Sequence, residues 1–182
     1  MGTLCYTLVD SETDTRGFDC GNTSINELVS SSVFPSILKQ VKTYKMSIRA
    51  KRIGFFSVSI RGISFEDSDA SIASYYEKAP TFGAVMIDFI AVEKKVQKRG
   101  IGTTALEYVV QAAKELSAHW PVRVLVLDAL RDTIDWYTQK GFAPINTVDL
   151  ASDSPVVRLY IDLMTEEEQT KLDQHIQNSI DY

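Results

Sequence analysis

Two glycines stand between an apolar run and an amphipathic run in the middle of the chain. Residues 88–92 end the apolar run, a short basic stretch follows, and Gly100-Ile101-Gly102 opens the amphipathic run. Glycine lets the backbone approach a ligand closely. The first N–H groups of a helix have no partner within it, and the helix dipole adds about half a positive charge there. A strand, a glycine turn and a helix N-terminus together are typical of an anion site, most often for phosphate.

The neighbouring residues narrow the type of phosphate site. Residues 97–104 read Gln-Lys-Arg-Gly-Ile-Gly-Thr-Thr, so Lys98 and Arg99 add positive charge. A P-loop has a lysine directly after its last glycine, and a threonine stands there instead. The dinucleotide fingerprint needs three glycines, and two are present. On this pattern alone, an ordinary strand-to-helix turn with a glycine hinge stays an equal alternative.

The pattern Gln97-x-x-Gly100-x-Gly102 resembles the acetyl-CoA pyrophosphate loop of the GNAT superfamily of N-acetyltransferases. A second segment, residues 134–142, is similar to the GNAT segment Ala-x-x-Phe-Tyr-x-x-x-Gly-Phe. The resemblance implies that Tyr137 lies near the CoA sulfur and protonates the departing thiolate. A phenol with a pKa near ~10 is protonated at neutral pH, and a positioned acid speeds such a step by roughly 10²–10⁴. The alternative, that Tyr137 only packs in the core, is weakened by the match of both segments.

The resemblance also implies which residues hold the cofactor. Backbone groups of the strand before the loop would bind the pantetheine arm, and N–H groups of the loop would bind the pyrophosphate. The cofactor-binding residues predicted in this way are Ile90, Val92, Gln97, Lys98, Arg99, Gly100, Ile101, Gly102 and Thr103. One position departs from the family, because many members carry an asparagine after the strand equivalent to 122–127, where this chain has Asp128 and the residues that follow it.

No residue is assigned as general base. Asp88, Glu66 and Glu27 are candidates, and water could accept the amine proton instead. Cys5 and Cys20 both precede the cofactor region, so we expect direct attack of the amine on the thioester without a covalent enzyme intermediate. With two histidines and two scattered cysteines, no metal site is predicted.

Periodicity predicts the elements that position these residues. An apolar stripe predicts a core-facing helix over 101–116, and alternating or apolar runs predict strands. Thr23 or Ser24 is expected to cap a first helix, Asp132 or Thr133 a short helix through Lys140, and Thr165 and Glu168 form a capping box for the last helix. The predicted strands are 4–9, 43–49, 53–60, 82–92, 122–127, 142–148 and 156–164, with a second helical piece at 36–42, a hairpin turn at 50–52 and an irregular segment at 63–81.

This order of elements predicts an α/β fold. The central β-α-β unit requires a right-handed crossover and a locally parallel pair, whereas the hairpins at either end require antiparallel pairing. We therefore expect a GNAT-like mixed, mostly antiparallel central sheet with helices on both faces. Residues 1–164 would form the acetyltransferase domain, and 165–182 a helical extension of it.

Composition limits the class of protein. The 182 residues suffice for one domain with a core, and 45% hydrophobic and 24% charged residues are ordinary for a globular protein. Two cysteines are too few for a disulfide framework. Neither a membrane-spanning run nor a signal peptide is evident, so we expect a cytoplasmic protein with no membrane partner.

The sequence defines the reaction more closely than it defines the acceptor amine. Residues 18–21, Phe-Asp-Cys-Gly, with the short helix after them, resemble the opening of the GNAT toxins of toxin–antitoxin pairs. That resemblance implies acetylation of the α-amine of aminoacyl-tRNA and control by an antitoxin protein. The stretch 28–64 has basic but no acidic residues and would suit tRNA phosphates. Against this, the net charge is −5, and the acidic tail helix from Thr165 would repel phosphate if it lay near the site.

Two other functions stay open from the sequence. One is an N-acetyltransferase for a small molecule or a protein N-terminus, for which the acidic net charge is no obstacle. The other is a catalytically silent GNAT-fold binding module. A homodimer is also left open.

Overall fold

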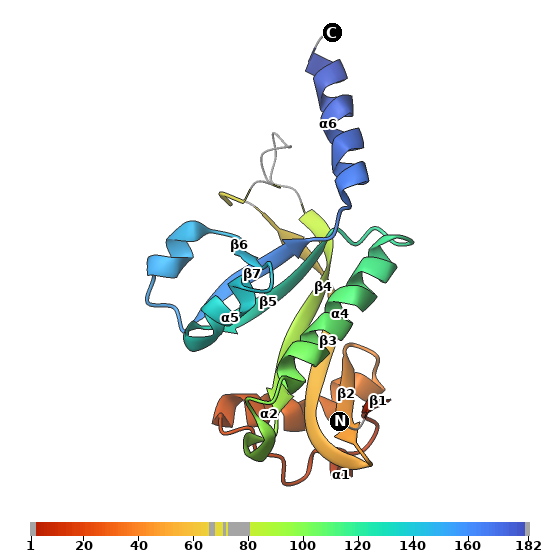
Figure 1. Ribbon diagram of the computed structural model, residues 1–182, viewed down its shortest axis with the longest axis vertical. Helices are drawn as coiled ribbons and strands as arrows, with labels where there is room; N and C mark the ends of the chain where they lie inside the picture. Colours follow the sequence, from red (N-terminus) through yellow and green to blue (C-terminus); the bar gives the residue numbers. More distant parts are fainter. Residues whose placement is uncertain (1–2, 66–67, 71, 73–80, 181–182) are drawn as a thin grey trace.

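The computed structural model describes residues 3–65, 68–70, 72 and 81–180. The described residues form a seven-stranded sheet in the order β1-β2-β3-β4-β5-β7-β6, with helices on both faces (Figure 1). The β4–β5 pair is parallel and the other described pairs are antiparallel, which confirms the predicted mixed, mostly antiparallel sheet. The strands are β1 (Leu4–Leu8), β2 (Lys42–Ile48), β3 (Lys51–Ser64), β4 (Thr81–Val92), β5 (Val124–Leu130), β6 (Ala143–Pro144) and β7 (Val156–Asp162). The helices are α1 (Glu12–Thr15), α2 (Thr23–Ser31), α3 (Val33–Ile37), α4 (Ile101–Ser117), α5 (Ile134–Thr138) and α6 (Glu166–Ile180), with 3-10 turns at Lys94–Val96, Arg131–Thr133 and Thr147–Ala151.

The two central strands separate toward their carboxyl ends. β4 and β5 pair from Ala84–Val124 to Ile87–Leu127. Beyond that point β4 stays bonded to β3 as far as Val92, and β5 stays bonded to β7. Figure 1 shows the two strands diverging below the middle of the sheet, with α4 in front of β4 and α5 beside the end of β5. In open sheets of this kind, the carboxyl ends of the strands are the usual place for a ligand.

Two faces of the sheet have different coverings. On one face, which we call the α4 face, Ile87, Leu106 and Leu125 belong to a large buried cluster. On the opposite face, which we call the α2 face, one cluster packs Val29 of α2 against the sheet, and a separate cluster lies nearer β6. Because successive strand residues point to opposite faces, β4 contributes to both sides, and Met86 joins the α2-face cluster near β6.

A β-bulge interrupts this alternation at the opening. Ser57 of β3 pairs with Phe89, while the next residue, Val58, pairs with Ile87. Asp88 is therefore an extra residue on β4 and has no register partner on β3. A bulge re-aims a side chain, and the Asp88 carboxylate accepts hydrogen bonds from Ser57 and Ser59 on the α2 face.

Several predicted boundaries are wrong for local reasons. The helix predicted to be capped by Thr23 or Ser24 is capped one residue earlier, by Asn22, whose Oδ1 accepts from the Ile25 N–H at 3.1 Å. The hairpin turn is not at 50–52, because Ile48 pairs with Lys51 and leaves a two-residue turn. Arg49 and Ala50 form it, and both have positive φ, as a type I′ turn requires. The second helical piece is Val33–Ile37 rather than 36–42.

Predictions after the long helix also shift. The strand predicted at 142–148 is only Ala143–Pro144, and Thr147–Ala151 forms a 3-10 turn. Pro144 lacks an N–H group, so it cannot donate to a continuing ladder. The strand predicted at 122–127 is displaced to Val124–Leu130. Within the stretch 63–81, β3 continues to Ser64 and β4 begins at Thr81, and most of the remainder lies outside the described residues.

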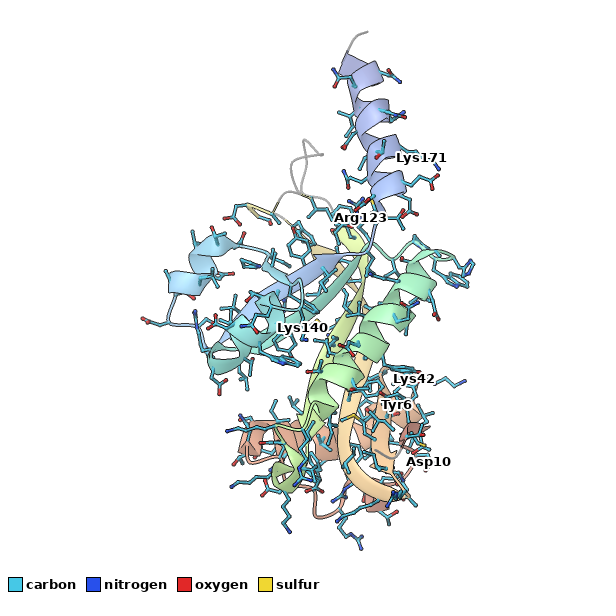
Figure 2. The ribbon with its side chains drawn as sticks, in the orientation of Figure 1. Tyr6, Asp10, Lys42, Arg123, Lys140 and Lys171 are labelled. Carbon is cyan, nitrogen blue, oxygen red and sulfur yellow. The ribbon has the colours of Figure 1, made fainter. Side chains whose placement is uncertain are left out.

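The last helix projects away from the sheet. Its predicted capping box is confirmed, because the Thr165 N–H donates to Glu168 Oε2 at 2.8 Å and the Glu168 N–H donates to Thr165 Oγ1 at 3.2 Å. Figure 2 places Lys171 on α6 and Arg123 near its base, whereas Lys140 lies beside α5 at the other end of β5. Among the described residues, no helix is long and apolar enough to cross a membrane. The division of the chain at residue 164 stays a prediction.

Candidate active site

A cleft of about 610 Å³ lies on the α4 face at the opening between β4 and β5. The carboxyl-terminal part of β4, the glycine loop, the first turn of α4 and the helix α5 form its walls. The predicted residues that line it are Ile90, Val92, Gln97, Lys98, Gly100, Ile101, Gly102, Thr103 and Tyr137. Of the predicted cofactor residues, Arg99 alone is not part of the lining. Two segments that are far apart in sequence are thus brought to one cleft.

The glycine loop presents backbone N–H groups to this cleft. Gly100 is the N-cap residue of α4, with φ of 80°, and no side chain caps this helix end. No atom lies within 4 Å of the position where a Cβ of Gly100 would stand, so the positive φ, not crowding, favours glycine. The Thr104 N–H bonds to the Gly100 carbonyl. The preceding N–H groups, of residues 101–103, have no intrahelical acceptor and can bind an anion.

Gln97 ties the loop to the N-terminal segment. Its Nε2 donates to the carbonyl of Val92 at 3.0 Å and to that of Cys20 at 2.7 Å. Three residues earlier, the Lys94 N–H donates to the Asp19 carbonyl at 2.9 Å. The two ends of the loop are therefore held against residues 19–20, which the sequence had linked only to a toxin-like opening.

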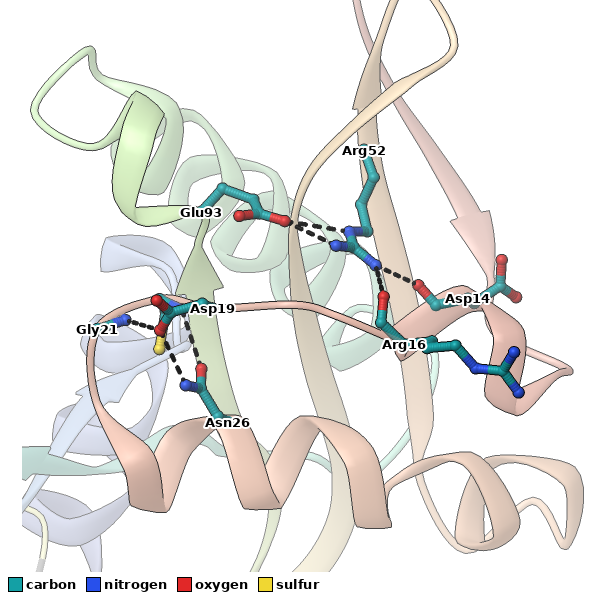
Figure 3. Close-up of polar contacts among 8 residues, drawn as sticks. Asp14, Arg16, Asp19, Gly21, Asn26, Arg52 and Glu93 are labelled. Atoms are coloured by element: carbon teal, nitrogen blue, oxygen red, sulfur yellow. Dashed lines mark hydrogen bonds and ion pairs between the residues drawn. The ribbon is translucent and has the colours of Figure 1, made fainter.

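The segment that receives the loop is itself fixed by side chains (Figure 3). Asp19 Oδ1 accepts from the Gly21 N–H at 2.7 Å and from Asn26 Nδ2 at 3.0 Å, and Asn26 Oδ1 accepts from the Cys20 N–H at 2.9 Å. The hydrogen bonds from Gly21 and Asn26 lower the pKa of the Asp19 carboxyl, which therefore stays ionised at neutral pH. Gly21 has φ of 84°, a conformation that glycine adopts at no steric cost.

Arg52 joins the same segment to the end of β4 (Figure 3). Its Nε and Nη2 donate to Glu93 Oε1 at 3.3 and 2.8 Å, and its Nη1 donates to the carbonyls of Asp14 and Arg16 at 2.9 Å each. Its guanidinium also lies 5.6 Å from the ring centre of Phe18. Both charged groups are mostly buried, so removing one partner would leave the other charge poorly solvated.

Tyr137 combines core packing with access to the cleft. Its ring makes edge-to-face contacts with Trp136 and Phe142, at centroid distances of 4.6 and 5.6 Å. Burial raises the pKa of Tyr137 to about 12, so the phenol stays protonated throughout the physiological range. Gly141, with φ of 90°, ends the turn, and the Phe142 N–H donates to the Tyr137 carbonyl. Tyr137 therefore packs in the core, as the alternative from the sequence had it, and also lines the cleft.

The expected side-chain cap of α5 is absent from the described residues. Thr133 is the N-cap residue, but its hydroxyl donates backward to the Leu130 carbonyl at 2.8 Å instead of accepting from the helix. Asp132 lies in the 3-10 turn that precedes α5. This turn continues directly into the helix, so no residue in an extended conformation stands before it as a cap. Both residues line the cleft.

The candidate bases occupy different places. Asp88 lies in the bulge on the α2 face, where it also accepts from Arg61. Glu27 is exposed on α2, and Glu66 lies outside the described residues. Cys5 is exposed on β1, at the edge of the sheet far from the cleft. Across the described part of the chain, no group of three or more His, Cys, Asp or Glu residues could hold a metal ion.

Comparisons with known proteins agree with this geometry. The family model of the GNAT acetyltransferases matches residues 53–142. Among solved structures, a bacterial toxin is 19% identical with a TM-score of 0.73, covering 100% of this chain and 97% of that chain. AtaT complexed with acetyl-methionyl-tRNA is 16% identical with a TM-score of 0.72, covering 88% and 95%. A tyrosine-to-phenylalanine variant of KacT is 16% identical with a TM-score of 0.72, covering 94% and 98%. No curated protein sequence matches significantly.

The chain belongs to the GNAT acetyltransferase family. It is accordingly an acetyl-CoA-dependent acetyltransferase, as the two sequence segments predicted. At these identities, the likeness to the solved structures shows the fold and leaves the acceptor to be argued from the site.

Gly102→Glu should abolish acetyl-CoA binding, with a loss of at least ~100-fold in affinity, because a carboxylate would stand where we expect the pyrophosphate to bind. A Cβ at this position would lie 3.9 Å from Val92 Cγ2, which is ordinary contact, and an acidic residue suits the first turn of a helix, so folding should be unaffected. Isothermal titration with acetyl-CoA measures the affinity. Gly102→Gln, equal in size but neutral, is the control; equal affinities of the two variants would contradict the role of charge.

Gln97→Ala should weaken acetyl-CoA binding roughly tenfold, because two hydrogen bonds that order the loop are lost, each worth about 0.5–1.5 kcal/mol. The thermal midpoint should change less than these values suggest, since the two bonds order an exposed loop that can open locally without global unfolding. The same titration checks the affinity. Gln111→Ala, which removes an exposed amide on α4 that donates to Glu115, serves as control. An unchanged affinity in Gln97→Ala would mean that the loop is ordered without this tie.

Proposed function

We propose that the enzyme transfers the acetyl group of acetyl-CoA to the α-amine of aminoacyl-tRNA, with Tyr137 as the general acid. The observation that carries the proposal is the meeting of the free N–H groups of residues 101–103 and the protonated Tyr137 phenol in one cleft. The first group suits the pyrophosphate of the donor, and the second suits its sulfur. The cofactor residues are those predicted from the sequence, with Arg99 outside the wall of the cleft.

The reaction needs one acid and no covalent enzyme intermediate. The amine nitrogen attacks the thioester carbonyl carbon, an N–C bond forms and the C–S bond breaks. As negative charge grows on sulfur, the Tyr137 phenol donates to it, and the proton that leaves the nitrogen restores the phenol through solvent. Because the phenol pKa is about 12, the phenol is the donor form at any pH at which the enzyme would work.

The charge distribution is compatible with tRNA as acceptor. AtaT, which shares the fold, is known complexed with acetyl-methionyl-tRNA. The acidic helix α6 starts after Asp162, which pairs with Val124 at the beginning of β5, whereas the cleft lies beyond the end of that strand. The acidic helix therefore stands at the far end of the sheet from the cleft, which removes the objection that it would repel phosphate there (Figure 1).

Part of the basic stretch is free to meet phosphate. Lys45 is bound to Asp14, and Arg52 to Glu93, so these two cations are neutralised within the protein. Lys39 and Lys51 are exposed. Contacts of exposed cations with phosphates would make acceptor binding weaken with salt. A protein antitoxin is part of the same proposal, since AtaT is also known bound to the C-terminus of the antitoxin AtaR.

Tyr137→Phe should lower kcat by roughly 10²–10⁴, because the departing thiolate loses its proton donor, and should leave the affinity for acetyl-CoA unchanged. Transfer of labelled acetyl groups from acetyl-CoA to a pool of charged tRNA measures the rate. Tyr108→Phe, on α4 outside the cofactor cleft, is the matched control. If tRNA stays unlabelled while small amines or peptides become labelled, aminoacyl-tRNA is not the acceptor. An unchanged kcat in Tyr137→Phe would contradict the assignment of Tyr137 as the general acid.

Wild-type kcat should show no falling limb due to Tyr137 below a pH of about 11. The folded pKa is raised above its ordinary value, so the protonated donor is complete below that ordinary value and is lost only as the pH rises through about 12. A pH profile of labelled transfer to a stable amide-linked acceptor checks this. A limb near pH 9 that disappears in Tyr137→Phe would show that the phenol ionises early.

A further inference from the structure

An apolar groove of about 410 Å³ lies between the second half of α4 and the strands β2 and β3. It shares no lining residue with the cofactor cleft, which lies at the first turn of the same helix. Tyr44 and Phe56 line it and stack on each other, with ring centroids 5.0 Å apart. Ile60 and Tyr108 also line it, and they are 61% and 44% exposed. The described part of the chain therefore leaves an apolar surface open to solvent.

The charged residues of this groove are basic. Among the described residues that line it, Lys39 and Lys42 alone carry a charge, and neither is in an ion pair within the described part of the chain. Figure 2 places Lys42 beside α4, on the side away from Lys140. The surrounding stretch 28–64 has no acidic residue. A partner that fits the groove therefore combines apolar side chains with negative charge.

The helix α6 has no covering from its own chain. None of residues 166–178 is buried, and the three core clusters of the described residues contain none of them. Figure 1 shows α6 directed away from the sheet. Isolated helices shorter than ~12–15 residues are marginal in water, and α6 has 15 residues. A stable α6 therefore requires packing against another molecule.

One side of α6 has the composition that the groove requires. Gln169, Leu172 and Ile176 recur at spacings of three and four, so they share one side of the helix, and they are half-buried whereas the residues between them are exposed. Glu166 and Asp173 are seven residues apart and flank this side. The helix is acidic, with three glutamates in its first turn. Its apolar stripe bordered by carboxylates is thus complementary to an apolar groove bordered by lysines.

The groove and the base of α6 lie at the same end of α4. Leu116, in the last turn of α4, lines the groove. Lys114 and Ser117, in the same turn, line a small hollow together with Thr165 and Glu168 at the start of α6. With 15 residues, α6 extends about 22 Å from this point. Two copies related by a two-fold axis near this end would place each α6 along the groove of the other.

We propose that the protein forms a two-fold dimer in which α6 of each copy lies in the groove of the other. Leu172 and Ile176 pack against the apolar lining that includes Ile60 and Tyr108, and the carboxylates beside them face the lysines of the groove. The two-fold axis makes this contact twice, so each dimer covers two apolar stripes and two grooves. The dimer is independent of the acceptor that the enzyme uses.

Sedimentation equilibrium of the full-length protein measures the dimer. The wild type should reach a molar mass twice that of the chain and should dissociate on dilution. The double change Leu172→Gln and Ile176→Gln, the α6 variant, should weaken the dimer at least about tenfold, because two side chains no longer bury apolar area. Glutamine keeps a good helix propensity, so α6 itself is spared. Gln174→Ala, on the opposite side of α6, is the matched control and should leave the dimer unchanged.

A change in the groove should act in the same way. Ile60→Asp, the groove variant, places a carboxylate among the apolar side chains, so it should also weaken the dimer at least about tenfold. Val148→Asp is the control, because Val148 is apolar and 73% exposed but does not line the groove. Both the α6 variant and the groove variant should keep the wild-type affinity for acetyl-CoA, since the groove and the cofactor cleft share no residue.

Mixing the α6 variant with the groove variant separates a contact between copies from a loss of folding. In a mixed dimer, the unchanged α6 of the groove variant meets the unchanged groove of the α6 variant. An equimolar mixture should therefore contain more dimer than either variant alone. A mixture with no more dimer than its components would overturn the exchange of α6. A wild type that stays monomeric would overturn it too, as would a dimer that neither variant weakens, which would place the interface on another surface.

Discussion

The structure depends on the early end of the pairing between β4 and β5. Four residue pairs hold these strands together, and then each stays bonded only to its outer neighbour. Backbone N–H and C=O groups along the inner edges are left without a strand partner, and such groups need one. An extended ligand that carries amides, as the pantetheine arm of acetyl-CoA does, can supply it in the manner of an added strand. The same separation that opens the sheet would therefore contribute to affinity for a donor bound in the candidate cleft.

The opening also divides the chemistry between two faces. On the α4 face, a helix N-terminus and a phenol can serve the donor, and among the described residues that line the cleft Asp132 alone carries a carboxylate. On the α2 face, the residues that follow the last β4–β5 pair are Asp88 and Asp128, and each is in an ion pair with an arginine. The two faces of the opening therefore present different groups, helix N–H groups and a phenol on one and ion pairs on the other.

Local signals predicted much of the site, because the residues concerned lie in two short segments. The glycine loop follows β4 after one 3-10 turn, and Gly141 and Phe142 set the position of Tyr137 within one helical turn. What could not be predicted depends on partners far along the chain. The bulge at Asp88 requires the register of β3, and the ion pair of Arg52 with Glu93 joins residues 41 apart. The strand expected at 142–148 is only Ala143–Pro144, because the chain soon turns into the 3-10 segment Thr147–Ala151, which apolar content alone could not show.

The hydrogen bonds from Gln97 and Lys94 to the carbonyls of residues 19–20 couple the stability of the glycine loop to that of the N-terminal segment. Suppose that a ligand binds only when the loop is ordered, and that local unfolding of another segment disorders the loop. The ligand then raises the free energy of that local unfolding by its own binding free energy. Residues 19–26 should thus share in the stabilisation given by acetyl-CoA, although none of them lines the donor cleft. By reciprocity, anything that holds α2 in place, including a bound protein, raises affinity for the donor, and anything that pulls α2 away lowers it. The order of the N-terminal segment is thus coupled to the affinity for the donor, although the segment lies outside the cleft.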